Sequence, residues 1–169
     1  IWRPVRCLQT QASGSRNLIV NGDFESPDSA WGKSAMNGTH EFHYDDAQAH
    51  GGHYSGLLEC TALTQQDPPE NPYTSWSRWY QPTIPVEAGK TYRFRAWVRT
   101  EKDFPGQVTL WVIPAETKVA EARLSSTEGL WREVVLDGIT PNSERIDVYL
   151  NLMNGVGKVW FDDVELNEM

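Results

Sequence analysis

Cysteine is scarce in this 169-residue sequence, which contains only Cys7 and Cys60. Two cysteines are too few for a disulfide scaffold, and their spacing does not match that of zinc ligands. No apolar run approaches the roughly 18 residues that a membrane-spanning helix needs. Basic residues are outnumbered, and the formal net charge of -8 opposes binding to a phosphate backbone. We therefore expect neither nucleic acid nor a membrane as a partner.

Helix signals and hydrolase motifs are also rare, whereas strand signals recur between turn residues at the 8–12-residue spacing of a sandwich or barrel. The length fits a single domain. Two consecutive prolines within residues 65–72 exclude a strand interior there and predict a long loop. The strands are expected near residues 18–25, 40–44, 55–60, 74–81, 90–100, 107–113, 118–124, 131–136, 145–152 and 157–166.

Several of these segments alternate cleanly between apolar and polar residues. Val108, Leu110 and Val112 share one face of their segment, and the apolar residues of 146–152 alternate with polar ones in the same way. An alternation with period two gives each sheet one apolar face and one wet face. Two sheets stacked on their apolar faces form an all-β, two-sheet sandwich.

The first 16 residues differ from the rest of the chain. They are basic, lack alternation and end in serine and glycine, which is typical of a linker or leading segment. The chain begins at Ile1 without a signal-peptide pattern, and we expect a mature or excised fragment. The globular domain is therefore predicted to span residues 17–169.

Four motifs occur in an order that resembles the carbohydrate-binding modules of families 4, 9 and 22. They are residues 17–25 (NLIVNGDFE) followed by Trp31, residues 88–92 leading into 96–98, residues 129–131, and residues 159–166 (VWFDDVEL). The resemblance implies a β-jelly roll with a structural calcium ion and a concave sheet that binds glycan chains. It also implies a module that sits beside a secreted polysaccharide-degrading enzyme.

The wet face of one sheet is the expected carbohydrate-binding site. In a jelly roll with two Greek keys, the strands 74–81, 107–113, 118–124 and 145–152 share a sheet. Their outward positions bring together aromatic rings for stacking on sugars and polar groups for binding hydroxyls. These positions are Trp76, Arg78, Tyr80, Trp111, Asp147, Tyr149 and Asn151.

Two alternatives compete with this assignment. A reversed parity in strand 74–81 would place Ser77, Trp79 and Gln81 on the wet face instead. The second sheet offers another wet face, on which Trp97 lies among Arg93, Arg95 and Arg99. Alternating charge of this kind is typical of a solvated surface, and we expect this face to be the convex one.

A calcium ion is expected between the two ends of the domain. Glu25 closes the opening motif, and Asp162 and Asp163 lie in the last strand, which the resemblance implies to be close to it. Their hard oxygens suit calcium, and carbonyls near residues 51–53 could complete the shell. The alternative is that both aspartates bond backbone amides at a strand bulge. His40, His43, His50 and His53 do not complete a zinc set, and we interpret them as loop or rim residues.

The sequence thus predicts a non-catalytic, secreted module that binds polysaccharide or oligosaccharide beside a catalytic domain of the same chain. In an extracellular setting Cys7 and Cys60 are expected to form a disulfide. One alternative is a small jelly-roll polysaccharide lyase that uses Tyr149, Arg78 and a histidine. Another is a structural or adhesion sandwich without a ligand.

Overall fold

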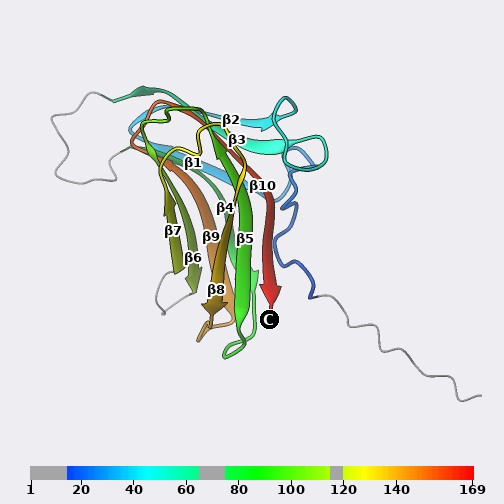
Figure 1. The fold of residues 1–169 in the computed structure, drawn as a ribbon. Coiled ribbons are helices and arrows are strands. Elements are labelled where there is room, and N and C mark those ends of the chain that lie inside the picture. Colours follow the sequence, from blue (N-terminus) through cyan, green and yellow to red (C-terminus); the bar gives the residue numbers. More distant parts are fainter. Residues whose placement is uncertain (1–14, 65–74, 115–119) are drawn as a thin grey trace, which may run out of the picture.

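The computed structural model describes residues 15–64, 75–114 and 120–169, and every regular element in these ranges is a β-strand (Figure 1). Ten strands form two five-stranded antiparallel sheets, which stack as a jelly-roll sandwich. The first sheet runs in the order β1 (Gly32–Met36), β4 (Trp76–Pro85), β9 (Arg145–Met153), β6 (Gln107–Pro114) and β7 (Ala120–Leu124). The second runs β2 (Gly38–Asp45), β3 (Ser55–Leu63), β10 (Gly157–Glu168), β5 (Tyr92–Thr100) and β8 (Arg132–Ile139).

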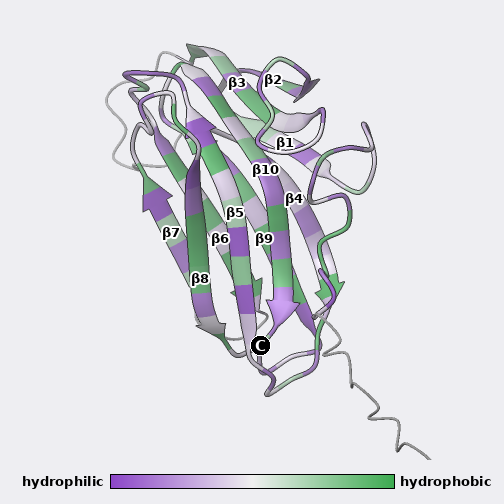
Figure 2. Cartoon of the chain, turned by 45° about the vertical axis from the view of Figure 1, so that its right-hand side comes forward, coloured by the Kyte–Doolittle hydropathy of each residue, from purple (hydrophilic) through white to green (hydrophobic). Residues whose placement is uncertain are grey.

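The core lies between the sheets and consists of the apolar positions of alternating strands. In β9, Ile146, Val148, Leu150 and Leu152 are fully buried. Hydrophilic and hydrophobic bands alternate along β5 in Figure 2, where the odd-numbered positions of Tyr92–Thr100 carry the arginines. No described helix is long and apolar enough to cross a membrane. The predicted two-sheet sandwich and its division of strands between the sheets are confirmed.

The parity of β4 decides which side chains the first sheet presents to solvent. Trp79 is fully buried and its ring packs edge-on against Phe24, Phe42 and Tyr44, with centroids 5.4–5.7 Å away. Since neighbouring residues of a strand point to opposite faces, the residues on either side of Trp79 face outward. The predicted parity of residues 74–81 is therefore correct where the structure describes it, and the reversed assignment is wrong.

The opening motif does not form the strand predicted for residues 18–25. It makes turns instead, because Asn21 and Phe24 adopt φ values of 54° and 55° that interrupt an extended ladder. Single hydrogen bonds still tie it to β10: the Leu18 amide donates to the Leu166 carbonyl at 2.8 Å, and the Val164 amide to the Gly22 carbonyl at 2.8 Å. The segment runs beside β10 in Figure 1 without joining either sheet as a strand.

The outer face of the second sheet is occupied by ion pairs. Arg95 lies 2.6 Å from Glu133 and 3.6 Å from Glu165, and Arg93 pairs with Asp137. The His50 ring stacks on Trp97 with centroids 3.9 Å apart and an interplanar angle of 15°. Arg99 differs, because it belongs to no ion pair among the described residues and its guanidinium carbon lies 5.8 Å from the Trp160 ring centroid. The paired Arg93 and Arg95 and the covered Trp97 still make this face a poor place for sugar stacking.

Three sequence predictions reach beyond the described residues, and one of them is the leading segment at residues 1–16, of which only residues 15 and 16 are described. The predicted loop at residues 65–72 lies outside them, as does Cys7. Cys60 has no disulfide partner within the described ranges, is 1% exposed, and its Sγ lies 3.5 Å from the Ala62 carbonyl oxygen. Burial raises the pKa of this thiol. The bridge from Cys7 to Cys60 therefore stays a prediction.

Candidate functional site

Three aromatic rings lie side by side across neighbouring strands on the outer face of the first sheet. Tyr80 of β4 is paired with Tyr149 of β9, which is paired with Trp111 of β6. The Tyr80 and Tyr149 ring centroids are 6.1 Å apart at an angle of 29°, and those of Tyr149 and Trp111 are 6.4 Å apart at 69°. All three side chains are partly exposed, so the rings can be reached from solvent.

Edge strand β1 holds the outermost of these rings in place. Gly32 lies opposite Tyr80 in the ladder, and a Cβ atom on Gly32 would overlap the Tyr80 ring. The glycine therefore leaves the space in which the ring lies against the backbone of β1. This strand was not among the predicted ones, because five residues without regular alternation give no clear strand signal.

A polar row runs parallel to the aromatic row and is displaced from it by two residues along each strand. It contains Arg78, Asn151 and Thr109, which are partners across β4, β9 and β6. Asn151 is fully buried, and its Nδ2 donates to the Thr109 carbonyl at 3.2 Å. Its Oδ1 is buried without a hydrogen-bond partner in the described part of the chain. Sequence reasoning did not single out Thr109, whose carbonyl orients this amide.

Arg78 lies among aromatic rings rather than carboxylates. Its guanidinium carbon is 3.8 Å from the Trp76 ring centroid, 5.0 Å from that of Tyr149 and 5.5 Å from that of Trp111. Burial lowers the pKa of Arg78, and the neighbouring Tyr149 hydroxyl opposes this shift. Burial raises the pKa of Tyr149, as does the charge of Asp147. Arg78 belongs to none of the ion pairs found among the described residues.

Asp147 lies on the other side of the aromatic row, opposite Ile113 in the ladder. Its Oδ1 accepts a hydrogen bond from the Thr83 amide at 2.7 Å. The structure thus brings all seven predicted residues to the outward side of one sheet, which we call the β4–β9–β6 face, with Asn151 buried beneath its neighbours. The face consists of Trp76, Arg78, Tyr80, Trp111, Asp147, Tyr149 and Asn151.

The residues predicted to bind calcium surround the loop 50–54. Glu25 Oε1 accepts hydrogen bonds from the His53 and Tyr54 amides at 2.7 and 2.8 Å. Asp162 Oδ2 accepts them from the His50 and Gly51 amides at 2.7 and 3.1 Å. Burial raises the pKa of Asp162 to about 6. These bonds match the alternative interpretation, in which the carboxylates hold backbone amides at a bulge.

Part of this set could nevertheless accept a cation. Glu25 and Asp163 lie against consecutive glycines: a Cβ atom on Gly52 would overlap the Glu25 carboxylate, and one on Gly51 would lie 3.0 Å from Asp163 Oδ2. Among described residues, Glu25 Oε2 and Asp163 Oδ1 have no hydrogen-bond partner. Carboxylate oxygens suit calcium, although the three predicted side chains do not form one compact group of ligand atoms.

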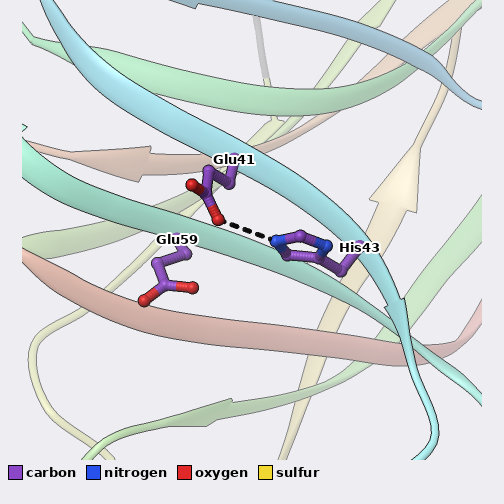
Figure 3. A group of neighbouring side chains, drawn as sticks. All are labelled: Glu41, His43 and Glu59. Atoms are coloured by element: carbon purple, nitrogen blue, oxygen red, sulfur yellow. Dashed lines mark hydrogen bonds and ion pairs between the residues drawn. The ribbon is translucent and has the colours of Figure 1, made fainter.

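One compact group of metal-ligating side chains does occur in the described residues. The ligand atoms of Glu41, His43 and Glu59 lie within 4.8 Å of one another on the outer face of β2 and β3 (Figure 3). His43 Nε2 already lies 3.0 Å from Glu41 Oε2, and Lys158 Nζ lies 3.9 Å from Glu59. The group is largely exposed and has its own charge partners, which is typical of a solvated ionic cluster.

Comparison with solved structures shows the same fold in proteins of low sequence identity. A CBM61 module, solved in complex with β-1,4-galactotriose, is 20% identical with a TM-score of 0.70, and the match covers 92% of this chain and 100% of that one. The CBM22-1 xylan-binding domain from Paenibacillus barcinonensis is 12% identical with a TM-score of 0.63, over 93% and 97% of the chains. A cyclase from Fischerella sp. TAU is 13% identical with a TM-score of 0.63, over 89% and 96%.

No curated protein matches the sequence. A family model described as a carbohydrate binding domain, CBM_4_9, matches residues 16–152. The match includes the aromatic and polar rows of the β4–β9–β6 face. The chain therefore belongs to the CBM_4_9 family of carbohydrate-binding domains.

Proposed function

We propose that the chain binds a polysaccharide along the β4–β9–β6 face and has no catalytic activity of its own. The observation that supports this best is the row of Tyr80, Tyr149 and Trp111, whose rings lie 6.1 and 6.4 Å apart on adjacent strands. Pyranose rings present C–H faces that stack on exposed aromatic side chains. A row that crosses three strands can contact successive sugar units of an extended chain.

The polar row would fix the orientation of the bound sugars. Asn151 Oδ1 and Arg78 Nε are both buried without a hydrogen-bond partner among the described residues. Buried polar groups of this kind gain most from a ligand that completes their hydrogen bonds. Trp76 would close one end of the site, where its ring supports the Arg78 guanidinium.

Affinity electrophoresis against a panel of polysaccharides tests the function directly. The panel should include β-1,4-galactan and xylan, because structural relatives are described with galactotriose and as xylan-binding. Retarded migration with at least one polymer is the expected result. A chain that migrates unchanged through every polymer would support the alternative of a structural sandwich without a ligand.

The same panel tests for catalysis. A lyase would need a general base or acid near Tyr149 and Arg78. His40 and His43 lie on β2 of the second sheet, and His50 and His53 lie in the loop between β2 and β3. His40 approaches the first sheet only at Ser75, 3.5 Å away, and faces the interior rather than the β4–β9–β6 face. We therefore expect no reducing ends and no unsaturated uronate products after long incubation. Accumulation of either product would contradict a purely binding role.

The setting of the module is also part of the proposal. We expect it to act outside the cell, beside a catalytic domain in the same chain, which it would hold on its polysaccharide. The support is membership of the CBM_4_9 family. We also propose that Glu25 and Asp163 bind a structural calcium ion at the loop 50–54, away from the sugar-binding face.

A further inference from the structure

The charge of Arg78 is not compensated by any described residue. Arg93, Arg95 and Arg123 each pair with a carboxylate, whereas Arg78 and Arg99 belong to no ion pair within the described ranges. Of these two, Arg78 is the one that lies among several partly exposed rings, whereas Arg99 lies 5.8 Å from the single ring of Trp160 on the second sheet. The Nε atom of Arg78 is buried and has no hydrogen-bond partner among the described residues. Taking a charged group partly out of water without a counter-charge destabilises the folded protein. Groups of this kind are enriched at functional sites, where a ligand can supply the missing partner.

The surroundings of Arg78 limit what that partner can be. The Trp76 ring covers the guanidinium at 3.8 Å, and Tyr149 and Trp111 flank it at 5.0 and 5.5 Å. These rings surround the guanidinium, and an arginine side chain presents its terminal N–H groups as a planar fork. A planar carboxylate matches this fork with two parallel hydrogen bonds and also neutralises the charge, which a neutral hydroxyl cannot do.

The acidic residues of the same face lie away from Arg78. Asp147 is on the far side of the aromatic row and bonds the Thr83 amide, and Glu121 pairs with Arg123 on β7. The aromatic row therefore has a positive charge on one side and a negative charge on the other. A sugar stacked on the row would gain by directing a carboxylate toward Arg78 and away from Asp147.

We infer that the glycan bound on the β4–β9–β6 face carries uronic acid units, and that Arg78 binds their carboxylate. This inference rests on the proposed sugar-binding role of that face. It names a ligand class, the acidic polysaccharides, and the residue that distinguishes them from neutral chains of similar shape.

Matched polymers test the inference with the full chain. Isothermal titration should compare uronate-containing polysaccharides, such as glucuronoxylan and polygalacturonate, with the same polymers after chemical reduction of their carboxyl groups to alcohols. We expect at least about tenfold tighter binding of the acidic form, since a hydrogen bond to a charged group contributes about 1.5–3 kcal/mol. Arg78→Gln should remove the preference, and Arg78→Lys should keep only part of it.

Arg93→Gln on the second sheet is the matched control, because it removes the same charge from the other face. It should keep the preference of the wild-type protein. Melting curves of both Gln variants show whether either has lost its fold. Equal or tighter binding of the reduced polymers would overturn the inference and leave the proposed sugar-binding function intact. An acidic preference that survives Arg78→Gln would also overturn it. No binding to any polymer would overturn the proposed function itself.

Discussion

Two of the eight tryptophans illustrate how the position of one ring decides its role. Trp111 lies in the aromatic row of the first sheet, whereas Trp97 lies on the outer face of the second sheet beneath His50. Both are partly exposed, so composition alone does not separate them. Their neighbours distinguish the two. Trp111 lies near the Tyr149 ring and the Arg78 guanidinium, whereas the Trp97 ring is covered by His50.

We predict that Trp111→Ala or Tyr149→Ala weakens glycan binding by about 1–3 kcal/mol, as expected when a central aromatic anchor is removed. Neither side chain belongs to the core between the sheets, so the melting temperature should change little. Isothermal titration against the best polymer, with melting curves in parallel, measures both effects. Trp97→Ala should bind normally, and if it alone loses affinity, the site is on the second sheet.

His40 provides a prediction about pH. It faces the interior from β2, its Nδ1 is buried without a hydrogen-bond partner among the described residues, and burial lowers its pKa below the usual 6.5. Below about pH 6.5 the unfolded chain therefore binds a proton at this position that the folded chain does not. The free energy of unfolding is therefore higher above about pH 6.5, where His40 is neutral in both states, and it decreases as the pH falls and the unfolded chain takes up a proton.

Chemical denaturation at about pH 7.5 and pH 5.5 checks this effect. His40→Gln should lose less stability than the wild-type protein on acidification, because the replacement does not titrate. His43→Gln on the exposed side of the same strand is the control and should behave like the wild-type protein. An identical pH dependence in all three proteins would show that His40 has no such role.

At the scale of strands, the sequence predicted long alternating segments well and irregular ones poorly. The period-two pattern of β9 and β6 correctly assigned their core and outer positions, because one buried face leaves little freedom of register. The opening segment has apolar residues at a strand-like density, yet left-handed backbone at Asn21 and Phe24 turns it away from a ladder. Such dihedral angles depend on tertiary contacts that no local pattern encodes.

In the candidate site, too, some features could be predicted from the sequence and others could not. Its seven side chains could be grouped from parity and strand order, because a face is a repeating feature of a sheet. Two features of Arg78 could not be predicted: its Nε lacks a hydrogen-bond partner among the described residues, and its guanidinium stacks on Trp76. Both depend on side-chain rotamers and on whether the neighbouring strands offer a hydrogen-bond acceptor. Likewise, nothing in the local pattern of β1 indicates that Gly32 would lie under the Tyr80 ring.

Strand β1 yields a prediction of its own. Gly32→Ala should displace the Tyr80 ring and disturb the aromatic row, with an overpacking cost of about 1–3 kcal/mol in stability. Glycan affinity and melting temperature should both fall. In a Tyr80→Ala background the same change should cost little, because the overlapping ring is gone. A full loss in that background would point to backbone strain at residue 32 instead.

At the scale of the whole molecule, the proposed calcium ion would join segments far apart in the chain. Glu25 and Asp163 are separated by most of the domain and meet at the loop 50–54. Saturating calcium should therefore raise the melting temperature relative to chelator, by the linkage expected when a ligand binds only the folded state. Glycan binding at a temperature where both forms are folded should change little.

Glu25→Gln is the informative variant. The amide oxygen of glutamine can still accept hydrogen bonds from the His53 and Tyr54 amides, but it lacks the negative charge that calcium prefers. It should lose most of the calcium-dependent shift. If the wild-type protein melts at the same temperature with calcium and with chelator, and elemental analysis finds no metal, the bulge interpretation is sufficient.

The position of β10 has a consequence for biosynthesis. It is the central strand of the second sheet, bonded to β3 on one side and β5 on the other, yet it comes after the other nine described strands in chain order. Until residues 157–168 leave the ribosome, the β2–β3 hairpin and the β5–β8 pair have no strand to join them. We therefore expect the second sheet to be completed only late in folding, once β10 is available to pair with β3 and β5.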